Sequence, residues 1–399
     1  MPDRFAFDKL FAKSAPPPRP RAPVRRAKYD FAIAYPDPES VPLDDLVESL
    51  KDALRAEGKD LALYPNIQGY PPLREFVAQK LARDRDIHVS PDDIMLGDGS
   101  GQPIHMVAEA LLDPGDVVLA DDFFYSGTLG SFRRFKADVR GIPSDSDGML
   151  PDTLESAIQK AIGEGKKPKL IYLIPAFQNP QGWTMPLERR RAVLRICQRH
   201  GVPILEDDCY VDLRYDGDPV TSIYSQDDSS LVMYVGSFSK LIAPGMRMGY
   251  LTAPPEVMDR MRAIKSGSGV NQFSALAVHR YSVAHLEGHI EDHNRVLRAK
   301  RDAMLSALGE NFGPAATWSH PDGGLYIWLR MPEGSNLVAL QEKAMNADVG
   351  YQSGAMFAPD GVSGKNFARL CFGYNSPSEI REGIARLAEV FTREGVLKG

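Results

Sequence analysis

Apolar positions recur along this chain in two patterns that alternate. Short runs of mostly apolar residues are typical of buried strands, and they lie at 117–120, 169–175, 202–206 and 231–235. Elsewhere apolar residues spaced three or four apart predict helices, of which a clear example covers 187–200. Strands that alternate with helices predict an α/β fold, in which helices cover both faces of a mainly parallel sheet.

The chain before the first of these strands has a helical pattern. A first helix is expected where apolar residues recur at helical spacing, at Leu43, Leu46, Val47, Leu50 and Leu54. A second helix is expected to begin near Pro72. The loop between them, YPNIQGYPPLR at 64–74, is rich in Pro, Asn and Gly in a way that core packing does not require.

Residues 1–28 differ from the rest of the chain. The segment APPPRPRAPVRRAK at 15–28 is proline-rich and basic, so an extended arm is expected there rather than a helix interior or a central strand. Two alternatives stay open for this arm: a mobile tail, or an arm that packs across a second subunit.

Composition narrows the class of protein. With 399 residues, 43% of them hydrophobic and 25% charged, the chain can bury a large core and is expected to form two domains. The net charge of -6 gives no reason to expect nucleic acid or an anionic membrane as a partner. No stretch approaches the ~18 apolar residues of a membrane span, and the amino terminus lacks the apolar core of a secretory signal. A cytoplasmic protein is therefore expected.

The cysteines and histidines argue against a disulfide framework and a metal site. Cys197, Cys209 and Cys371 lie far apart without a C-x-x-C pair, and small buried apolar residues are expected at all three positions. The histidines show no metal-ligand spacing with other donors, so no metal site is predicted.

Polar residues able to do chemistry directly follow the predicted strands. They are Ser100 and Gly101 at the start of a helix, then Asn179, Asp207, Ser237, Ser239 and Lys240. Because the carboxyl ends of parallel strands meet at one edge of a sheet, these residues should converge on one crevice.

Together these residues indicate a cofactor. The turn GSGQ at 99–102 places backbone amides at a helix start, and Arg247 can grip a phosphate with two parallel hydrogen bonds. A phosphate site beside an amine, a carboxylate and an amide fits pyridoxal 5′-phosphate, whose aldehyde binds a lysine and whose pyridine nitrogen pairs with a carboxylate. Taken singly, Asp207 can also be a helix cap, Asn179 part of a plain turn, and Tyr125 core packing.

From about residue 29 to residue 396 the chain resembles the pyridoxal-phosphate enzymes of fold type I. It is most similar to the class I and II aminotransferase family, in the branch of the 2-aminoadipate and aromatic aminotransferases. Seven motifs occur in the family's order, among them SFSK at 237–240 and FARLCFGY at 367–374. The resemblance implies a homodimer, with a large domain (45–285) whose mainly parallel sheet lies between helices, and a smaller α+β domain (29–44 and 286–399).

The resemblance also implies a role for each site residue. Lys240 would form an aldimine with the cofactor and move the proton between Cα and C4′, Asp207 would pair with the pyridine nitrogen, and Tyr125 would stack on the ring. The other cofactor-binding residues would be Ser100, Gly101, Gln102, Asn179, Tyr210, Ser237, Ser239 and Arg247, with Tyr64 reaching the phosphate from the second subunit. Arg369 would hold the substrate's α-carboxylate, with Asn179 and Tyr35 also at the substrate.

Two positions depart from the family's pattern. Tyr35 stands where the family usually has a glycine, and Phe123 stands where a proline usually precedes the stacking tyrosine by two residues. Both changes add bulk near the substrate. With Tyr351 they would line an aromatic pocket, which favours apolar, aromatic or long side chains.

The resemblance implies an aminotransferase that moves an amino group between an L-amino acid and a 2-oxo acid by a ping-pong route. One alternative is another pyridoxal-phosphate reaction on the same fold, such as that of a lyase, racemase, decarboxylase or oxidase. A less favoured one is a non-enzymatic ligand-sensing domain. Regulators of that kind carry a helix-turn-helix before this domain, and only about 28 proline-broken residues precede the fold here.

Overall fold

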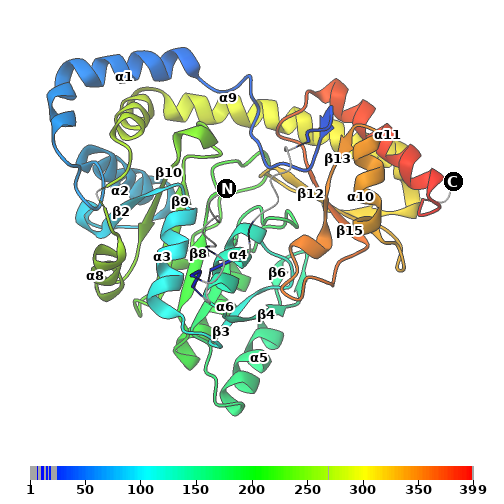
Figure 1. Cartoon of the computed structure of the whole chain (residues 1–399), viewed down its shortest axis with the longest axis horizontal. Coiled ribbons are helices and arrows are strands. Elements are labelled where there is room, and N and C mark those ends of the chain that lie inside the picture. Colours follow the sequence, from blue (N-terminus) through cyan, green and yellow to red (C-terminus); the bar gives the residue numbers. More distant parts are fainter. Residues whose placement is uncertain are drawn as a thin grey trace, which may run out of the picture.

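The computed structural model describes residues 25–267 and 269–397, together with residues 7, 10–12, 15, 16 and 18. Much of the arm predicted at 1–28 therefore lies outside the described residues. Within them the chain has the predicted α/β architecture, with a central sheet flanked by helices and a smaller sheet in the carboxyl-terminal part (Figure 1). No helix among the described residues is long and apolar enough to span a lipid bilayer.

The central sheet has seven strands in the order β2-β10-β9-β8-β7-β3-β4. Their bounds are Ile94–Asp98 (β2), Val117–Asp121 (β3), Asp138–Ile142 (β4), Leu170–Leu173 (β7), Ile204–Asp207 (β8), Val232–Ser237 (β9) and Met248–Thr252 (β10). Strand β10 runs antiparallel to both of its neighbours, and the other pairs are parallel. The carboxyl ends of β7, β8 and β9 consequently lie side by side.

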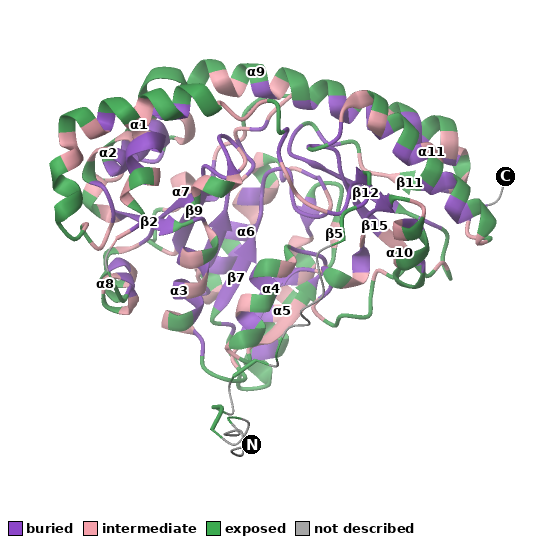
Figure 2. Cartoon of the chain, turned by 45° about the horizontal axis from the view of Figure 1, so that its top comes forward, coloured by how far each residue is buried: buried purple, intermediate pink, exposed green. Residues whose placement is uncertain are grey.

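Helices cover both faces of this sheet, and alternate residues of a strand face opposite layers. On β3, Val118 and Ala120 belong to the same buried cluster as residues of α3 (Gly101–Leu111) and α4 (Ser126–Arg134). Val117 and Leu119 belong instead to a cluster with α5 (Pro151–Gly163) and α6 (Leu187–His200). Burial on both faces explains why the strands read as nearly continuous apolar runs, and Figure 2 shows buried strands beneath helices with exposed outer faces.

The smaller sheet has four antiparallel strands in the order β11-β12-β15-β14. Their bounds are Thr317–Trp318 (β11), Tyr326–Arg330 (β12), Gln352–Ser353 (β14) and Phe367–Cys371 (β15). Apolar residues of this sheet, of α10 (Leu337–Asn346) and of α11 (Pro377–Arg393) form a separate buried cluster with Tyr29 and Phe31. Strand β1 (Tyr29–Asp30) pairs with β13 (Val349–Gly350), so the segment before the first helix joins this smaller part.

The remaining elements are shorter or lie at the edges of these layers. They are α1 (Leu43–Glu57), η2 (Gly58–Ala62), α2 (Pro71–Arg85), η3 (Pro91–Asp93), β5 (Ser144–Asp145), β6 (Gly148–Met149), α7 (Ile223–Gln226), η4 (Pro244–Met246), α8 (Pro255–Ile264), η5 (Gly313–Ala315) and η6 (Gly354–Met356).

Helix α9 (Gln272–Phe312) is a single helix of 41 residues that runs along both parts of the chain (Figure 1). The division expected between residues 285 and 286 falls inside it. Its buried Lys300 forms an ion pair with Asp37 and donates a hydrogen bond to the carbonyl of Gly373 at 2.9 Å. The segment before α1 and the turn after β15 are therefore held at one point of α9.

Helix α1 does not bury all of its apolar residues. Leu46 is buried, but Leu43 is 67% exposed and Val47 is 50% exposed. Leu63 and Tyr64, which follow η2, are also exposed. Several apolar residues of α1 and of the segment after η2 are thus exposed within one chain.

Candidate active site

A cavity of about 160 Å³ lies at the carboxyl ends of β7, β8 and β9. It is lined by Ala34, Ser100, Gly101, Tyr125, Ile174, Asp207, Cys209, Tyr210, Ser237, Ser239, Lys240, Pro244 and Arg247. The crevice expected from the strand ends is therefore present. It brings together most of the residues predicted to bind the cofactor.

One end of the cavity is a set of hydrogen-bond donors. Helix α3 begins here, and its N-cap Ser100 makes no side-chain cap, so the first amides of the helix are free to bind an anion. The hydroxyls of Ser237 and Ser239 line the same cavity. This end has the chemistry of a phosphate site.

Arg247 lies beside this set of donors and is fixed by the backbone around it. Its Nη2 donates to the carbonyl of Asp98 at 2.9 Å, and its side chain remains 51% exposed. Gly99 has φ +66°, and a Cβ on Gly99 would lie 2.2 Å from Nη2 of Arg247. A glycine is thus required here twice, for its backbone angle and for the close approach of the guanidinium.

Lys240 reaches into the cavity just after β9. Its Nζ donates to the carbonyl of Ala34 at 2.6 Å, which connects the lysine to the segment before α1. Burial lowers the pKa of Lys240 below the usual lysine value. A lowered pKa leaves more of the amine neutral, as a nucleophile or a proton acceptor needs.

Asp207 is the last residue of β8 and is 3% exposed. Its carboxylate accepts hydrogen bonds from the hydroxyl of Tyr172 at 2.6 Å and from the thiol of Cys209. Both donors are neutral, and no lysine, arginine or histidine among the described residues forms an ion pair with Asp207. Burial raises the pKa of Asp207, and the two hydrogen bonds oppose that rise.

A buried amide and two phenols form a network beside the cavity. Asn179 donates from Nδ2 to the hydroxyl of Tyr210 at 3.1 Å, and that hydroxyl lies 2.9 Å from the hydroxyl of Tyr326. All three residues are buried. The structure therefore joins Asn179 to Tyr210, two of the residues that the resemblance places at the cofactor.

Arg369 lies on β15 and is 5% exposed. Its Nη1 donates to Oδ1 of Asn179 at 3.2 Å, and its guanidinium lies over the rings of Tyr326 and Phe357. Its Nε is buried without a partner, and no carboxylate of the described residues pairs with it. A buried cation without a counter-ion is costly, so this position suits an anionic ligand.

Four predicted site residues lie outside the lining of this cavity besides Arg369 and form other contacts. Gln102 accepts a hydrogen bond from the amide of Asp98. The hydroxyl of Tyr35 accepts a hydrogen bond from Arg26 at 3.1 Å, and its ring packs at a tilt of 55° against the ring of Tyr374. Asn179 reaches the cavity through Tyr210, as described above. Tyr64 is 93% exposed, so it does not reach the cavity of its own chain.

Sequence reasoning missed part of this site. Cys209 was expected to be a small buried apolar residue, but it lines the cavity and donates to Asp207. Its position two residues after Asp207 was the available signal. Tyr351, expected near the substrate, donates to the carbonyl of Leu337 and packs on Phe391 in the core of the smaller part.

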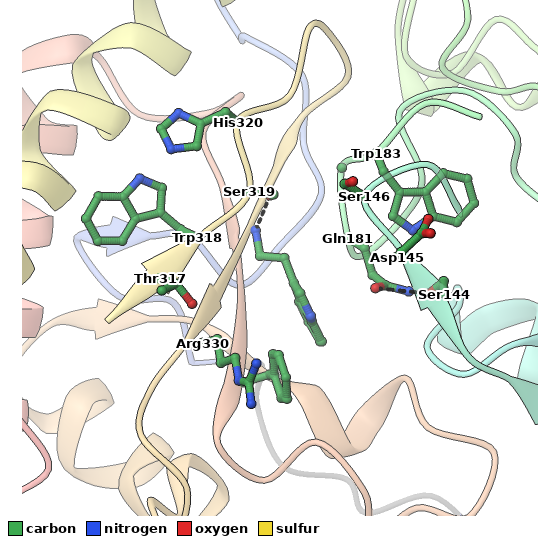
Figure 3. Close-up of a pocket in the computed structure, with 13 residues that line it drawn as sticks. Ser144, Asp145, Ser146, Gln181, Trp183, Thr317, Trp318, Ser319, His320 and Arg330 are labelled. Carbon is green, nitrogen blue, oxygen red and sulfur yellow. Dashed lines mark hydrogen bonds between the residues drawn. The ribbon is translucent and has the colours of Figure 1, made fainter. Parts of the chain in front are cut away.

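A larger cavity, of about 490 Å³, has different chemistry (Figure 3). Trp318 and His320 lie on one side of it, and Trp183 and Asp145 lie on the other. None of the described residues that line it is a lysine, and Asp145 already pairs with Arg189 at 3.1 Å. The smaller cavity is therefore the better candidate despite its size, because an amine, a carboxylate and anion-binding donors converge there.

Comparison with known proteins identifies the family of the chain. The model of the family "Aminotransferase class I and II" matches residues 32–387. The chain belongs to this family. The aminotransferase is 36% identical to aromatic-amino-acid aminotransferase 1 of Thermococcus litoralis over 368 residues, which are 91% of this chain and 88% of that protein.

Two further relatives extend the comparison. The 2-aminoadipate transaminase of Thermus thermophilus is 30% identical over 362 residues, 90% of the aminotransferase and 88% of that protein. The crystal structure of the multiple substrate aminotransferase from Thermococcus profundus superimposes with a TM-score of 0.92 at 30% identity, and covers 98% of this chain and 99% of that one. The protein is a pyridoxal-phosphate-dependent aminotransferase of fold type I, and its family works by a ping-pong mechanism.

The residues present fit the cofactor of this family. The free amides of α3 suit a phosphate, and the buried carboxylate of Asp207 lacks the cationic partner that a protonated pyridine would supply. The amine of Lys240 lies in the same cavity. When bound, pyridoxal phosphate supplies an aldehyde that condenses with amines and a ring that accepts electrons.

Proposed function

We propose that this cavity is the active site of the aminotransferase, with each residue in the role that its position supports. The start of α3 (Ser100, Gly101 and Gln102), Ser237, Ser239 and Arg247 hold the phosphate of the cofactor, and Asp207 holds its pyridine nitrogen. Asn179 and Tyr210 hold the 3-oxygen, and Tyr125 covers the ring from the mouth of the cavity, where it is 40% exposed. The observation that carries this proposal is the buried carboxylate of Asp207 in the same small cavity as the amine of Lys240.

Lys240 is the group that holds the cofactor and moves the proton at Cα of the substrate. Its amine lies close to the carbonyl of Ala34, and its lowered pKa favours the neutral form that accepts a proton. Arg369 orients the substrate because two of its nitrogens can bind both oxygens of the α-carboxylate. Arg369 would thus position Cα of the substrate, the carbon at which Lys240 moves the proton.

We propose L-amino acids with aromatic or long side chains as substrates. Two observations support this choice: the relatives include enzymes named for aromatic amino acids and for 2-aminoadipate, and the aromatic ring of Tyr125 belongs to a residue that lines the cavity. Tyr35 sits on the segment that carries Ala34, whose carbonyl accepts from Lys240. The acceptor is a 2-oxo acid, as for the family.

The reaction is tested by a half-reaction. With no oxo acid present, a panel of L-amino acids should convert the cofactor stoichiometrically to its amine form and stop after one turnover, because a ping-pong enzyme needs its second substrate to reset. Adding 2-oxoglutarate or pyruvate should restore the starting spectrum. The absorption spectrum of the cofactor and the yield of oxo acid measure both steps.

The opposite result would be many turnovers without an oxo acid. If ammonia, carbon dioxide, peroxide or the D-isomer accumulates while the cofactor keeps its starting spectrum, the proposed roles in transamination are wrong. A panel in which small or acidic side chains react fastest would contradict only the proposed substrate class.

We also propose a homodimer in which Tyr64 serves the site of the partner subunit. Tyr64 is 93% exposed, and the exposed Leu61 and Leu63 line the same hollow as Tyr64. Leu43 and Val47 on α1 and Phe273 on α9 are exposed as well. A cluster of exposed apolar side chains is more favourably buried at a subunit interface than left in water. A second copy of this chain would cover it by two-fold symmetry.

The dimer is tested with one charge. Leu63→Glu should convert a dimeric sedimentation profile into a monomeric one and lower kcat at least about tenfold, because it places a charge in the apolar centre of the interface. Val362→Glu is the matched control, since Val362 is also exposed (57%) but lies outside this cluster. A fully active monomer of the parent protein would exclude the proposal.

The proposal also covers the division into domains and the cellular compartment. The chain divides into a large domain at 45–285 and a small domain at 29–44 and 286–399, supported by the separate buried cluster around α10 and α11. The protein works in the cytoplasm, which its free cysteines Cys197, Cys209 and Cys371 support, because reducing compartments keep thiols unpaired.

A further inference from the structure

Both oxygens of the Asp207 carboxylate accept hydrogen bonds from side chains that the sequence did not place in the site. The hydroxyl of Tyr172 donates to Oδ2 at 2.6 Å, and the thiol of Cys209 donates to Oδ1. Tyr172 comes from β7 and is fully buried, while Cys209 lies at the cavity. The carboxylate is thus held from two sides by neutral donors.

These contacts belong to a longer chain of polar groups. Thr128 on α4 donates from Oγ1 to the hydroxyl of Tyr172 at 3.2 Å. At the other end the sulfur of Cys209 lies 3.3 Å from Oγ of Ser100, at the start of α3. Because an ionised carboxylate only accepts, the single hydrogen of the thiol goes to Asp207. The chain therefore links α4, β7, β8 and the anion-binding end of the cavity.

The two donors keep their protons over the working pH range. Burial raises the pKa of Tyr172 well above its usual value, and the charge of Asp207 raises it further. Burial and the same charge also raise the pKa of the Cys209 thiol well above its usual value. Tyr172 and Cys209 therefore remain donors whenever Asp207 is ionised.

The charge of Asp207 is set by opposing influences. Burial raises its pKa most, the hydrogen bonds from Cys209 and Tyr172 lower it, and the neighbouring charge of Asp208 raises it. The other titratable and charged groups at the cavity are Tyr125, Tyr210, Lys240 and Arg247. Without its donors, the carboxyl would take up a proton at a higher pH.

We propose that Tyr172 and Cys209 are positioning residues for Asp207, which hold its carboxylate ionised and in one orientation toward the pyridine nitrogen of the cofactor. A carboxylate has about four lone-pair sites, and two are engaged by these donors, so the remaining ones are free for the cofactor. Thr128 supports the ionised Asp207 indirectly through Tyr172, because a hydroxyl that accepts a hydrogen bond is a better donor. The inference rests on the proposed role of Asp207.

The test follows cofactor affinity rather than activity. The loaded full-length enzyme is dialysed to equilibrium against pyridoxal phosphate at a series of pH values, and the bound fraction gives a dissociation constant at each pH. Affinity falls as pH falls through the pKa of Asp207, because the protonated carboxyl loses its attraction for the pyridine nitrogen. A variant with a higher Asp207 pKa loses affinity at a higher pH.

Tyr172→Phe removes one hydroxyl and keeps the ring that packs against Phe124 and Phe132. We expect the acid limb of its affinity profile to move up by about one pH unit, because a hydrogen bond to a charged group is lost. Thr128→Val should move it in the same direction by less. Cys209→Ala should move it further than Cys209→Ser, in which a hydroxyl can still donate.

Tyr351→Phe is the control for losing a buried hydroxyl, since Tyr351 donates to a backbone carbonyl in the core of the smaller part. Its acid limb should stay at the parent's pH. If Tyr172→Phe weakens affinity equally at every pH, the hydroxyl serves packing alone and the inference is wrong. If Asp207→Asn also leaves affinity and its acid limb unchanged, the proposed role of Asp207 itself is wrong.

Discussion

Lys240→Ala is expected to lower kcat by about 10⁴-fold, near the upper end of what a single acid-base residue contributes. In the proposed roles, the variant loses both the amine that would bind the cofactor covalently and the group that would move the proton at Cα. The cofactor still has the donors of α3 and Arg247, so part of it should remain bound without a covalent link. Steady-state rates, normalised to bound cofactor, separate lost chemistry from lost cofactor.

The chain offers a matched control for this lysine. Lys265 is also buried and donates to the carbonyl of Leu96, and burial lowers the pKa of Lys265 to about 8. It lies outside the lining of the cavity, so Lys265→Met should keep kcat within a few-fold of the parent. Borohydride reduction of the loaded enzyme followed by peptide mapping should label Lys240. A label on Lys265 would overturn the role of Lys240.

The sequence predicted this cavity because of where parallel strands end. Asp207 and Ser237 are the final residues of β8 and β9, and Lys240 follows three residues later, so a correct strand assignment already brings them together. The helices were predicted from the spacing of their apolar residues, and α6 begins and ends at the expected residues 187 and 200. Local patterns therefore carry much of the architecture and the chemical core of the site.

Contacts between distant segments could not be predicted in the same way. Tyr172 reads as an ordinary apolar position of β7, and only the pairing of β7 with β8 brings its hydroxyl to Asp207. Tyr351 reads as a pocket residue by type, but the fold turns its ring onto Phe391. A side chain's direction depends on strand register and helix packing, which a single sequence does not specify.

The outward apolar stripe of α1 is a related case. Helical spacing identified the helix correctly, but spacing cannot tell whether the stripe meets the chain's own core or another subunit. Leu43 and Val47 are exposed within one chain, whereas Leu46 and Ala53 are buried. A wide apolar stripe on a surface helix therefore does not by itself specify which of its residues the chain buries.

Arg369→Ala is expected to lower kcat/KM by about 10³-fold for both the amino acid and the oxo acid, because two charge-assisted hydrogen bonds are each worth about 2 kcal/mol. Both substrates carry the same α-carboxylate, so both should lose affinity together. The guanidinium is 5% exposed and pairs with no carboxylate of the described residues, which leaves it available for the substrate. Initial rates over a range of both substrates measure the effect.

The structure also supplies the control and the decisive comparison for Arg369. Arg330 lies on the neighbouring strand β12 and over the ring of Phe367, and it is absent from the lining of the smaller cavity that holds Lys240. Arg330→Ala therefore removes a similar side chain from outside that cavity, and its kcat/KM should stay within a few-fold of the parent's. The parent should strongly prefer an amino acid to the corresponding amine, which lacks the carboxylate, and Arg369→Ala should lose most of that preference. If the preference persists, or if only substrates with acidic side chains are affected, Arg369 binds something other than the α-carboxylate. The preference for an amino acid over its amine depends on the substrate group that Arg369 binds, and not on how fast the variant reacts. The comparison therefore assigns the role of Arg369 even when the variant is weakly active.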